Sequence, residues 1–336
     1  MTLRPLLPLA WSILAQPAVL SAQTARPQAV QSADPLDTLL ETADRHHYAG
    51  RLDAARETLA RAETAARGAG PGGLARVWTA RGLVWLSETT ATNRGYPEAD
   101  SAAARALELA ERSGDSLLIA DAAELAGRVL YSRRINLAEG DYDAPSRHFE
   151  RALALRRAAA DTGGIVDALF RVGLIHERKD EGDRAVALYQ EGLRLAGSGY
   201  PLERSNLARH LGYQHLRRGD LDRALTYLQQ SHDLREQAGF VLVRSPALAS
   251  IGEVYRRKGD HARAREYVAR ALAEAERLEA SRFVVQALIA LGRIDSAAAR
   301  LEQARQQWRR AETLAGEIGY VSGARQAREF LATAAR

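Results

Sequence analysis

Small and large apolar residues recur at helical spacing along most of this chain. A small residue is followed four positions later by a usually large apolar one, and three positions after that by another small one. Steps of three and four residues return to the same face of an α-helix, so each set predicts one amphipathic helix. The sets are Ala55/Leu59/Ala62, Ala99/Ala103/Ala106, Pro145/Phe149/Ala152, Ala185/Tyr189/Gly192, Ala224/Leu228/Ser231, Ala264/Val268/Ala271 and Ala304/Trp308/Ala311.

These seven sets lie at a nearly constant period. Their first members are 44, 46, 40, 39, 40 and 40 residues apart. A fixed period in this range is typical of a solenoid, in which each repeat packs only on its neighbours. We therefore expect one continuous all-α body whose long surface holds a partner.

A second small residue lies twelve positions before the first member of most sets, inside a preceding helix. It is Ala43, Gly173, Gly212, Gly252 or Gly292. Glycine inside a helix costs about 1 kcal/mol relative to alanine, so its recurrence needs a packing reason. We predict that the first helix of each repeat lets the second helix come close at this position.

A glycine–aspartate turn joins the two helices in several repeats. Glycine can end the first helix in a left-handed conformation, and the aspartate can cap the second. Examples are Gly140-Asp141, Gly219-Asp220 and Gly259-Asp260.

This arrangement resembles the tetratricopeptide repeat, most clearly over residues 211–234 and 251–264. The resemblance extends over residues 36–316 and implies an α-solenoid, a right-handed superhelix of about seven helix-turn-helix repeats. The period near 40 indicates a long variety of the repeat, which occurs in peptide-binding scaffolds and bacterial regulators.

Three repeats depart from the pattern. The third has extra residues before its turn and carries Pro145, which a helix tolerates only in its first turn. The second has the turn Gly95-Tyr96-Pro97 and Ala103 in place of a large residue, and the seventh lacks a Gly-Asp turn. Residues 317–336 are expected to form a capping helix over the last repeat.

The N-terminus has the features of an export signal. Arg4 precedes a mostly apolar run, and Leu20-Ser21-Ala22 offers a small-residue cleavage site. We predict a signal peptide at residues 1–22, a flexible leader at 23–35 and export of a bacterial protein to the periplasm or the medium. The alternative is a disordered apolar N-terminus on a cytoplasmic protein. The run is too short for stable membrane insertion.

Composition narrows the function classes. The chain has no cysteine, which excludes disulfides, thiolate metal sites and cysteine nucleophiles. The net charge of +5 is spread along the sequence, acidic residues interleave with basic ones, and aromatics are only 6 %. We therefore expect no nucleic-acid partner.

No motif predicts an enzyme, a cofactor or a metal site. Gly68, Gly70 and Gly73 match G-x-G-x-x-G, but an alanine-rich helix rather than a strand precedes them. The histidines lack the spacing of a metal site, and His176 and His215 fall at a repeat position that usually packs inward. We predict a protein without catalytic activity.

The resemblance implies a peptide-binding groove lined by the first helix of each repeat. Arg178, Arg217 and Arg257 occupy one equivalent position in three consecutive repeats, a ladder that could hold an acidic peptide or a C-terminal carboxylate. The family's asparagine of the carboxylate clamp is missing. The alternative is solvated arginines that favour a helix C-terminus. The candidate groove residues are Arg128, Tyr131, Phe170, Glu177, Arg178, Arg209, Tyr213, Arg217, Arg256 and Arg257.

The predicted function is a non-enzymatic scaffold that binds a protein or peptide partner in the concave groove. The alternative is a sensory or regulatory module that acts on a separate effector, either protease-like or signalling. The sequence leaves the partner and the oligomeric state open.

Overall fold

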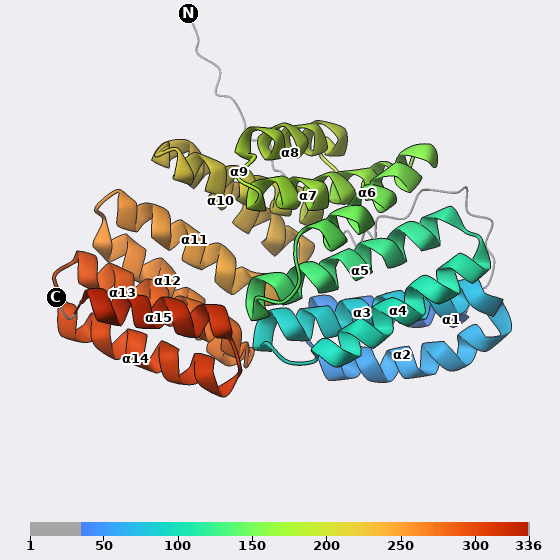
Figure 1. Ribbon diagram of the computed structural model, residues 1–336, viewed down its shortest axis with the longest axis horizontal. Coiled ribbons are helices and arrows are strands. Elements are labelled where there is room, and N and C mark those ends of the chain that lie inside the picture. Colours follow the sequence, from blue (N-terminus) through green and yellow to red (C-terminus); the bar gives the residue numbers. More distant parts are fainter. Residues whose placement is uncertain (1–34, 335–336) are drawn as a thin grey trace, which may run out of the picture. The chain divides into compact units, whose positions relative to one another are not determined.

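The computed structural model describes residues 35–334, so the predicted signal peptide and nearly all of the leader lie outside the described residues. These residues form α-helices and two short 3₁₀-helices without any strand (Figure 1). The helices are α1 (Pro35–Tyr48), α2 (Leu52–Ala66), η1 (Arg67–Ala69), α3 (Gly70–Thr92), α4 (Tyr96–Ser113), α5 (Ser116–Leu137), α6 (Asp143–Ala158), α7 (Thr162–Arg178), α8 (Gly182–Ala196), α9 (Pro201–Arg217), α10 (Leu221–Ala238), η2 (Val241–Val243), α11 (Arg244–Arg257), α12 (His261–Arg277), α13 (Ser281–Ala297), α14 (Leu301–Glu317) and α15 (Val321–Thr333).

Consecutive helices pack as seven pairs, from α1 with α2 to α13 with α14, and α15 packs on α14. This confirms the predicted α-solenoid of seven helix-turn-helix repeats with one further helix. Each pair buries the small and large residues of its set. In the last pair, Ala304 and Ala311 are fully buried and Trp308 is 2 % exposed.

The glycines inside the first helices have the packing role that their recurrence predicted. A Cβ added at any of them would clash with the large residue of the same repeat's second helix. The distance from the added Cβ to the nearest side-chain atom would be 2.4 Å for Gly173 and Tyr189 and 2.8 Å for Gly212 and Leu228. It would be 2.4 Å for Gly252 and Val268 and 2.3 Å for Gly292 and Trp308. In these four repeats one glycine thus sets how closely the paired helices approach.

The turns between paired helices follow the expected chemistry where Gly-Asp is present. Gly219 and Gly259 have φ of +80°, and the Asp220 carboxylate accepts from the Arg223 N–H at 3.2 Å. The seventh repeat keeps the same left-handed geometry without glycine, since Ala299 has φ of +60°. Pro145 lies in the first turn of α6, as helix geometry requires.

A feature that no repeat pattern predicted is the contact of the first pairs with the last ones. Arg282, at the start of α13, donates from Nε to the Thr90 carbonyl at 2.5 Å and from Nη1 to Asn136 Oδ1 at 2.8 Å. Thr90 and Asn136 lie at the C-terminal ends of α3 and α5, where a cation also favours the helix dipoles.

Two further hydrogen bonds strengthen this closing contact. The Asn93 amide donates to the Ile318 carbonyl at 3.0 Å, and the Ser322 hydroxyl donates to the Ile135 carbonyl at 2.9 Å. Ala91 of α3 is buried in one cluster with apolar residues of α13, α14 and α15. The ends of α3 and α5 therefore contact residues 146 to 225 positions later in the chain.

The first pair makes a similar distant contact. His47, at the end of α1, lies edge-on to Phe240 with ring centroids 5.4 Å apart. Leu242 of η2 is buried among apolar residues of α1, α2 and α3. The loop before α11 thus packs on the start of the solenoid.

We predict that Gly292→Ala destabilises the protein by about 1–3 kcal/mol, because the new methyl group overpacks against Trp308. Gly316→Ala in α14 is the matched control, because its Cβ would meet nothing within 4 Å. It should be neutral or stabilise by up to about 1 kcal/mol. Urea unfolding followed by circular dichroism measures both, and equal effects of the two substitutions would contradict the packing role.

Arg282→Met should destabilise the protein by about 1.5–3 kcal/mol, because it removes two charge-assisted hydrogen bonds and leaves Asn136 Oδ1 without this donor. Small-angle scattering should show a larger radius of gyration if the closing contact opens. Arg325→Met is the control, since Arg325 is exposed and lies 3.9 Å from Glu329. A comparable loss of stability in both variants would argue against the closing contact.

Candidate functional site

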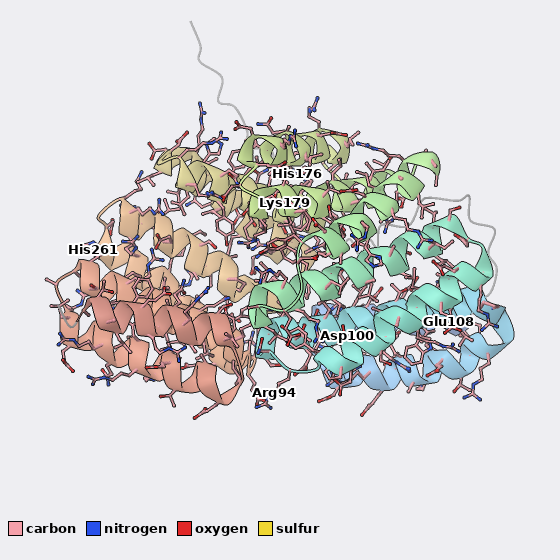
Figure 2. The ribbon with its side chains drawn as sticks, in the orientation of Figure 1. Arg94, Asp100, Glu108, His176, Lys179 and His261 are labelled. Atoms are coloured by element: carbon pink, nitrogen blue, oxygen red, sulfur yellow. The ribbon has the colours of Figure 1, made fainter. Side chains whose placement is uncertain are left out.

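The ladder arginines lie at equivalent ends of three consecutive first helices. Arg178, Arg217 and Arg257 are the last residues of α7, α9 and α11, and all three are exposed. In Figure 2, Lys179 marks the end of α7 and His261 the start of α12. The structure therefore places the three arginines at one edge of three successive pairs.

Each of these arginines also bonds to the preceding repeat. The bonds run from Arg178 Nε to the Tyr131 hydroxyl at 3.0 Å, from Arg217 Nη2 to Asp180 Oδ1 at 3.0 Å, and from Arg257 Nη1 to the Leu216 carbonyl at 2.9 Å. The equivalence of the three positions thus has a structural role in joining neighbouring repeats.

A second basic row follows directly after the first and was not singled out from the sequence. Its members pair with a carboxylate near the start of the preceding repeat's second helix. The pairs are Lys179 with Asp143 at 2.8 Å, Arg218 with Asp183 at 2.5 Å, and Lys258 with Asp222. The signal was available, because each ladder arginine is followed by another basic residue.

The remaining arginines of the candidate groove are held within or next to their own helices. The Arg209 guanidinium lies 5.6 Å from the ring centroid of Tyr213, whose hydroxyl is 2.7 Å from Ser250 Oγ. Arg256 donates to both carboxylate oxygens of Glu253, at 2.8 and 2.9 Å. Tyr213 and its partner connect α9 to α11.

Phe170 and Glu177 lie in the core rather than on an open surface. Phe170 is 2 % exposed and its ring centroid is 5.1 Å from that of His210. Glu177 lies 2.8 Å from His210 Nδ1 and accepts from the Tyr189 hydroxyl at 3.0 Å. Burial opposes ionisation of Glu177, but His210, Arg178 and the hydrogen bonds outweigh it and lower its pKa to about 2.

Arg128 belongs to a charge cluster shared by α5, α6 and α7. Its Nη1 is 3.7 Å from Glu124, which also lies 3.4 Å from Arg156 and 3.6 Å from Arg171. Arg171 pairs with Asp167 at 3.1 Å. Glu124 is almost fully buried, and a charge there needs a partner of opposite sign. Arg128 therefore serves as a structural partner of Glu124.

Burial and neighbouring charges shift the pKa values of the carboxyl groups around this cluster. Burial, Asp167 and a hydrogen bond with Asp167 raise the pKa of Glu124 to about 8. Burial opposes ionisation of Asp167, but Arg171 and the same hydrogen bond lower its pKa. Burial and Asp167 raise the pKa of Glu203 in α9 to about 7. Burial, Asp44 and Glu203 raise the pKa of Tyr48 at the end of α1.

Two buried arginines, Arg156 and Arg235, were not among the residues predicted from the sequence. Arg156 donates to Asp161 at 2.7 Å and Arg235 donates to the Val243 carbonyl at 2.8 Å, so each ties the end of a second helix to the loop after it. A signal existed, because the other five repeats have alanine at this position, eleven residues after the first small residue. These alanines are Ala66, Ala110, Ala196, Ala275 and Ala315.

His176 and His215 are half-buried, and each lies near a carboxylate five residues later, at 2.8 Å from Glu181 and 3.3 Å from Asp220. Among residues 35–334, no three His, Asp or Glu side chains form a group that could hold a metal ion. In the same part of the chain, no helix has the length and apolar character needed to cross a membrane.

Comparison with known families supports the tetratricopeptide resemblance in the best-formed repeats. Residues 203–273 match the tetratricopeptide repeat family, a stretch that begins in α9 and ends in α12. No curated protein matches the sequence.

Several solved structures share the fold over most of the chain. The crystal structure of the APC/C hetero-tetramer Cut9-Hcn1 matches with a TM-score of 0.61 and 16 % identity, over 90 % of this chain and 49 % of that one. A Rap protein complexed with competence and sporulation factor gives 0.55 and 12 %, over 89 % and 97 %. A tetratricopeptide repeat protein from Parabacteroides merdae gives 0.51 and 16 %, over 90 % and 99 %. The chain spans about half the matched Cut9-Hcn1 chain, and these identities establish the fold alone.

The raised pKa of Glu203 predicts a loss of stability as pH rises. The folded protein binds a proton at Glu203 that the unfolded chain releases near its ordinary pKa of about 4.5, so stability falls between about pH 4.5 and 7. Glu203→Gln should flatten this fall, as measured by urea unfolding at about pH 5 and 7.5. The exposed Glu57→Gln serves as control, and an unchanged slope in Glu203→Gln would refute the assignment.

Proposed function

We propose that this chain is a non-enzymatic scaffold that binds an acidic segment of a partner protein along Arg178, Arg217 and Arg257. The observation that carries the proposal is the exposure of these three arginines at equivalent helix ends in three consecutive repeats. A guanidinium can bind a carboxylate through two parallel hydrogen bonds, so a row of them selects a row of acidic residues.

The present partners of the row leave it open to exchange. The side chains of Arg217 and Asp180 are 54 % and 84 % exposed. Exposed ion pairs of this kind contribute only about 0–1 kcal/mol, so a ligand carboxylate can replace Asp180 at little cost. Arg257 can likewise exchange one of its two bonds while keeping the other.

The spacing of the row suits an extended peptide. Helices in contact have axes about 8–10 Å apart, and an extended chain advances about 3.3 Å per residue. α7 contacts α9 directly, so acidic residues three positions apart could reach Arg178 and Arg217.

Two similar structures add support, because both are of complexes, Cut9-Hcn1 and a Rap protein with competence and sporulation factor. The apolar run at residues 6–20 supports a location outside the cytoplasm, where the partner would also be found.

The closing contact favours a second candidate, a regulatory module that acts on a separate effector. Arg282 joins α13 to the ends of α3 and α5. A ligand that separates these ends would change the position of the last repeats relative to the first, which an effector bound to both could detect.

The test is binding of the full-length chain to arrayed peptides of about ten residues that carry glutamate or aspartate at every third position. The triple variant Arg178→Glu, Arg217→Glu and Arg257→Glu should weaken binding at least about tenfold, because it replaces three attractive contacts of up to about 1 kcal/mol each by repulsion.

The matched control reverses three other exposed arginines at equivalent positions of the same repeats, Arg184, Arg223 and Arg263. It changes the net charge equally and should leave binding within about twofold, apart from a general electrostatic effect. Equal losses in both triple variants, or binding that neither affects, would refute the arginine row as the site.

A further inference from the structure

A groove on α3 is lined by two tryptophans, Trp78 and Trp85, which are half-buried and pack partly against the core of α3, α4 and α5. It has a volume of about 400 Å³. Trp78 and Trp85 stand two helical turns apart on α3 and form its floor with residues of α2 and α4. The lining residues are Arg56, Trp78, Arg81, Trp85, Pro97, Glu98 and Ser101.

The two indole rings are fixed in place by neighbouring groups. The Arg56 guanidinium lies 4.5 Å from the Trp85 ring, and the Arg81 guanidinium lies 4.4 Å from the Trp78 ring. Gly95 has φ of +80° and supports Trp85 so closely that an added Cβ would be 2.9 Å from the ring. The irregular second repeat, with its Gly95-Tyr96-Pro97 turn, therefore shapes this groove.

The charges of the groove are not balanced. Arg56 pairs with Asp53, and Arg81 pairs with Glu63 at 2.8 Å. Glu98 is exposed, and among the described residues no ion pair or side-chain hydrogen bond involves it. The groove therefore presents one uncompensated negative charge beside its aromatic floor, which complements a cationic ligand group.

The indole N–H groups offer free donors. The buried Trp308 Nε1 donates to the Ile289 carbonyl at 3.2 Å, whereas neither Trp78 nor Trp85 has an acceptor among the described residues. A peptide in the polyproline II conformation makes no internal hydrogen bonds, so its carbonyl groups remain free to accept.

The spacing of the two rings matches the period of such a peptide. Residues seven apart on an α-helix are separated by about 10.5 Å along its axis. Three residues of polyproline II advance about 9.3 Å, so prolines one turn apart can meet successive indoles.

We propose that the groove of Trp78 and Trp85 binds a proline-rich segment of a partner in the polyproline II conformation, with a basic residue of that segment paired to Glu98. The prolines pack between the fixed indoles, the indole N–H groups donate to the peptide carbonyls, and Pro97 closes one end of the groove. This site is independent of the arginine row, which lies on α7, α9 and α11.

The test is fluorescence polarisation with the full-length chain and a labelled peptide of nine prolines that ends in arginine. Trp85→Ala should weaken binding at least about tenfold, as expected of an aromatic anchor. Trp85→Phe keeps the ring and removes the N–H, so it should cause a smaller loss and guards against an effect of misfolding, which circular dichroism checks.

Glu98→Gln should weaken binding of the arginine-ended peptide about threefold or more and leave a glutamine-ended peptide unaffected. Glu108→Gln, on the same helix, is the control, since the Glu108 carboxylate is already 2.6 Å from Arg105. The triple arginine variant of the row should bind the proline peptide normally, which separates this proposal from the preceding one.

Binding that survives Trp85→Ala and Glu98→Gln unchanged would overturn the proposal, as would absence of binding to any proline peptide by the folded chain. A glycine–serine peptide of equal length that binds as well would also overturn it. The chain's own Arg4-Pro5-Leu6-Leu7-Pro8 has the same character. If Pro5→Ala with Pro8→Ala raises affinity for the probe, that segment rather than a partner occupies the groove, and the proposed partner is wrong.

Discussion

In each regular repeat the two helices come together where a glycine of the first faces a large side chain of the second. Tyr189, Leu228, Val268 and Trp308 fill the space that a Cβ on the facing glycine would take. This contact fixes the distance within a pair. The small residue three positions after the large one lets the next pair approach, since a Cβ added at Gly192 would be 2.9 Å from Leu207 of α9. The rest of the structure follows from repeating this geometry, because equivalent positions in successive repeats then lie in rows.

Rows of equivalent residues explain why the same side chains serve both packing and recognition. Arg178, Arg217 and Arg257 each bond backwards to the preceding repeat, yet they keep exposed guanidinium groups. A residue in this position stabilises the stacking of repeats when no ligand is present and can turn to a ligand at low cost. The proposed scaffold function depends on this weakness of exposed ion pairs rather than on unpaired charge.

The repeat period predicted the fold because the determining contacts are local and recur seven times. It also predicted which residues would form the arginine row, but not that Phe170 and Glu177 are buried, since alternation along one helix cannot show what the next repeat covers. The closing contact was beyond the sequence for another reason. Arg282, Asn93 and Asn136 do not belong to the repeating sets of residues, and their partners lie in distant repeats. No periodicity in the sequence therefore indicates these contacts.

Departures from the repeat are therefore where this chain gains features that a regular solenoid lacks. In a regular repeat the large residue of the second helix packs against glycine and disappears from the surface. The second repeat has Ala103 at that position, and the half-buried Trp78 and Trp85 of its first helix line a groove beside two arginine side chains. An aromatic surface that a glycine with positive φ holds rigid lowers the entropy cost of binding a stiff peptide. The irregularity that weakens the repeat signal in the sequence is thus the physical reason to expect a second binding surface there.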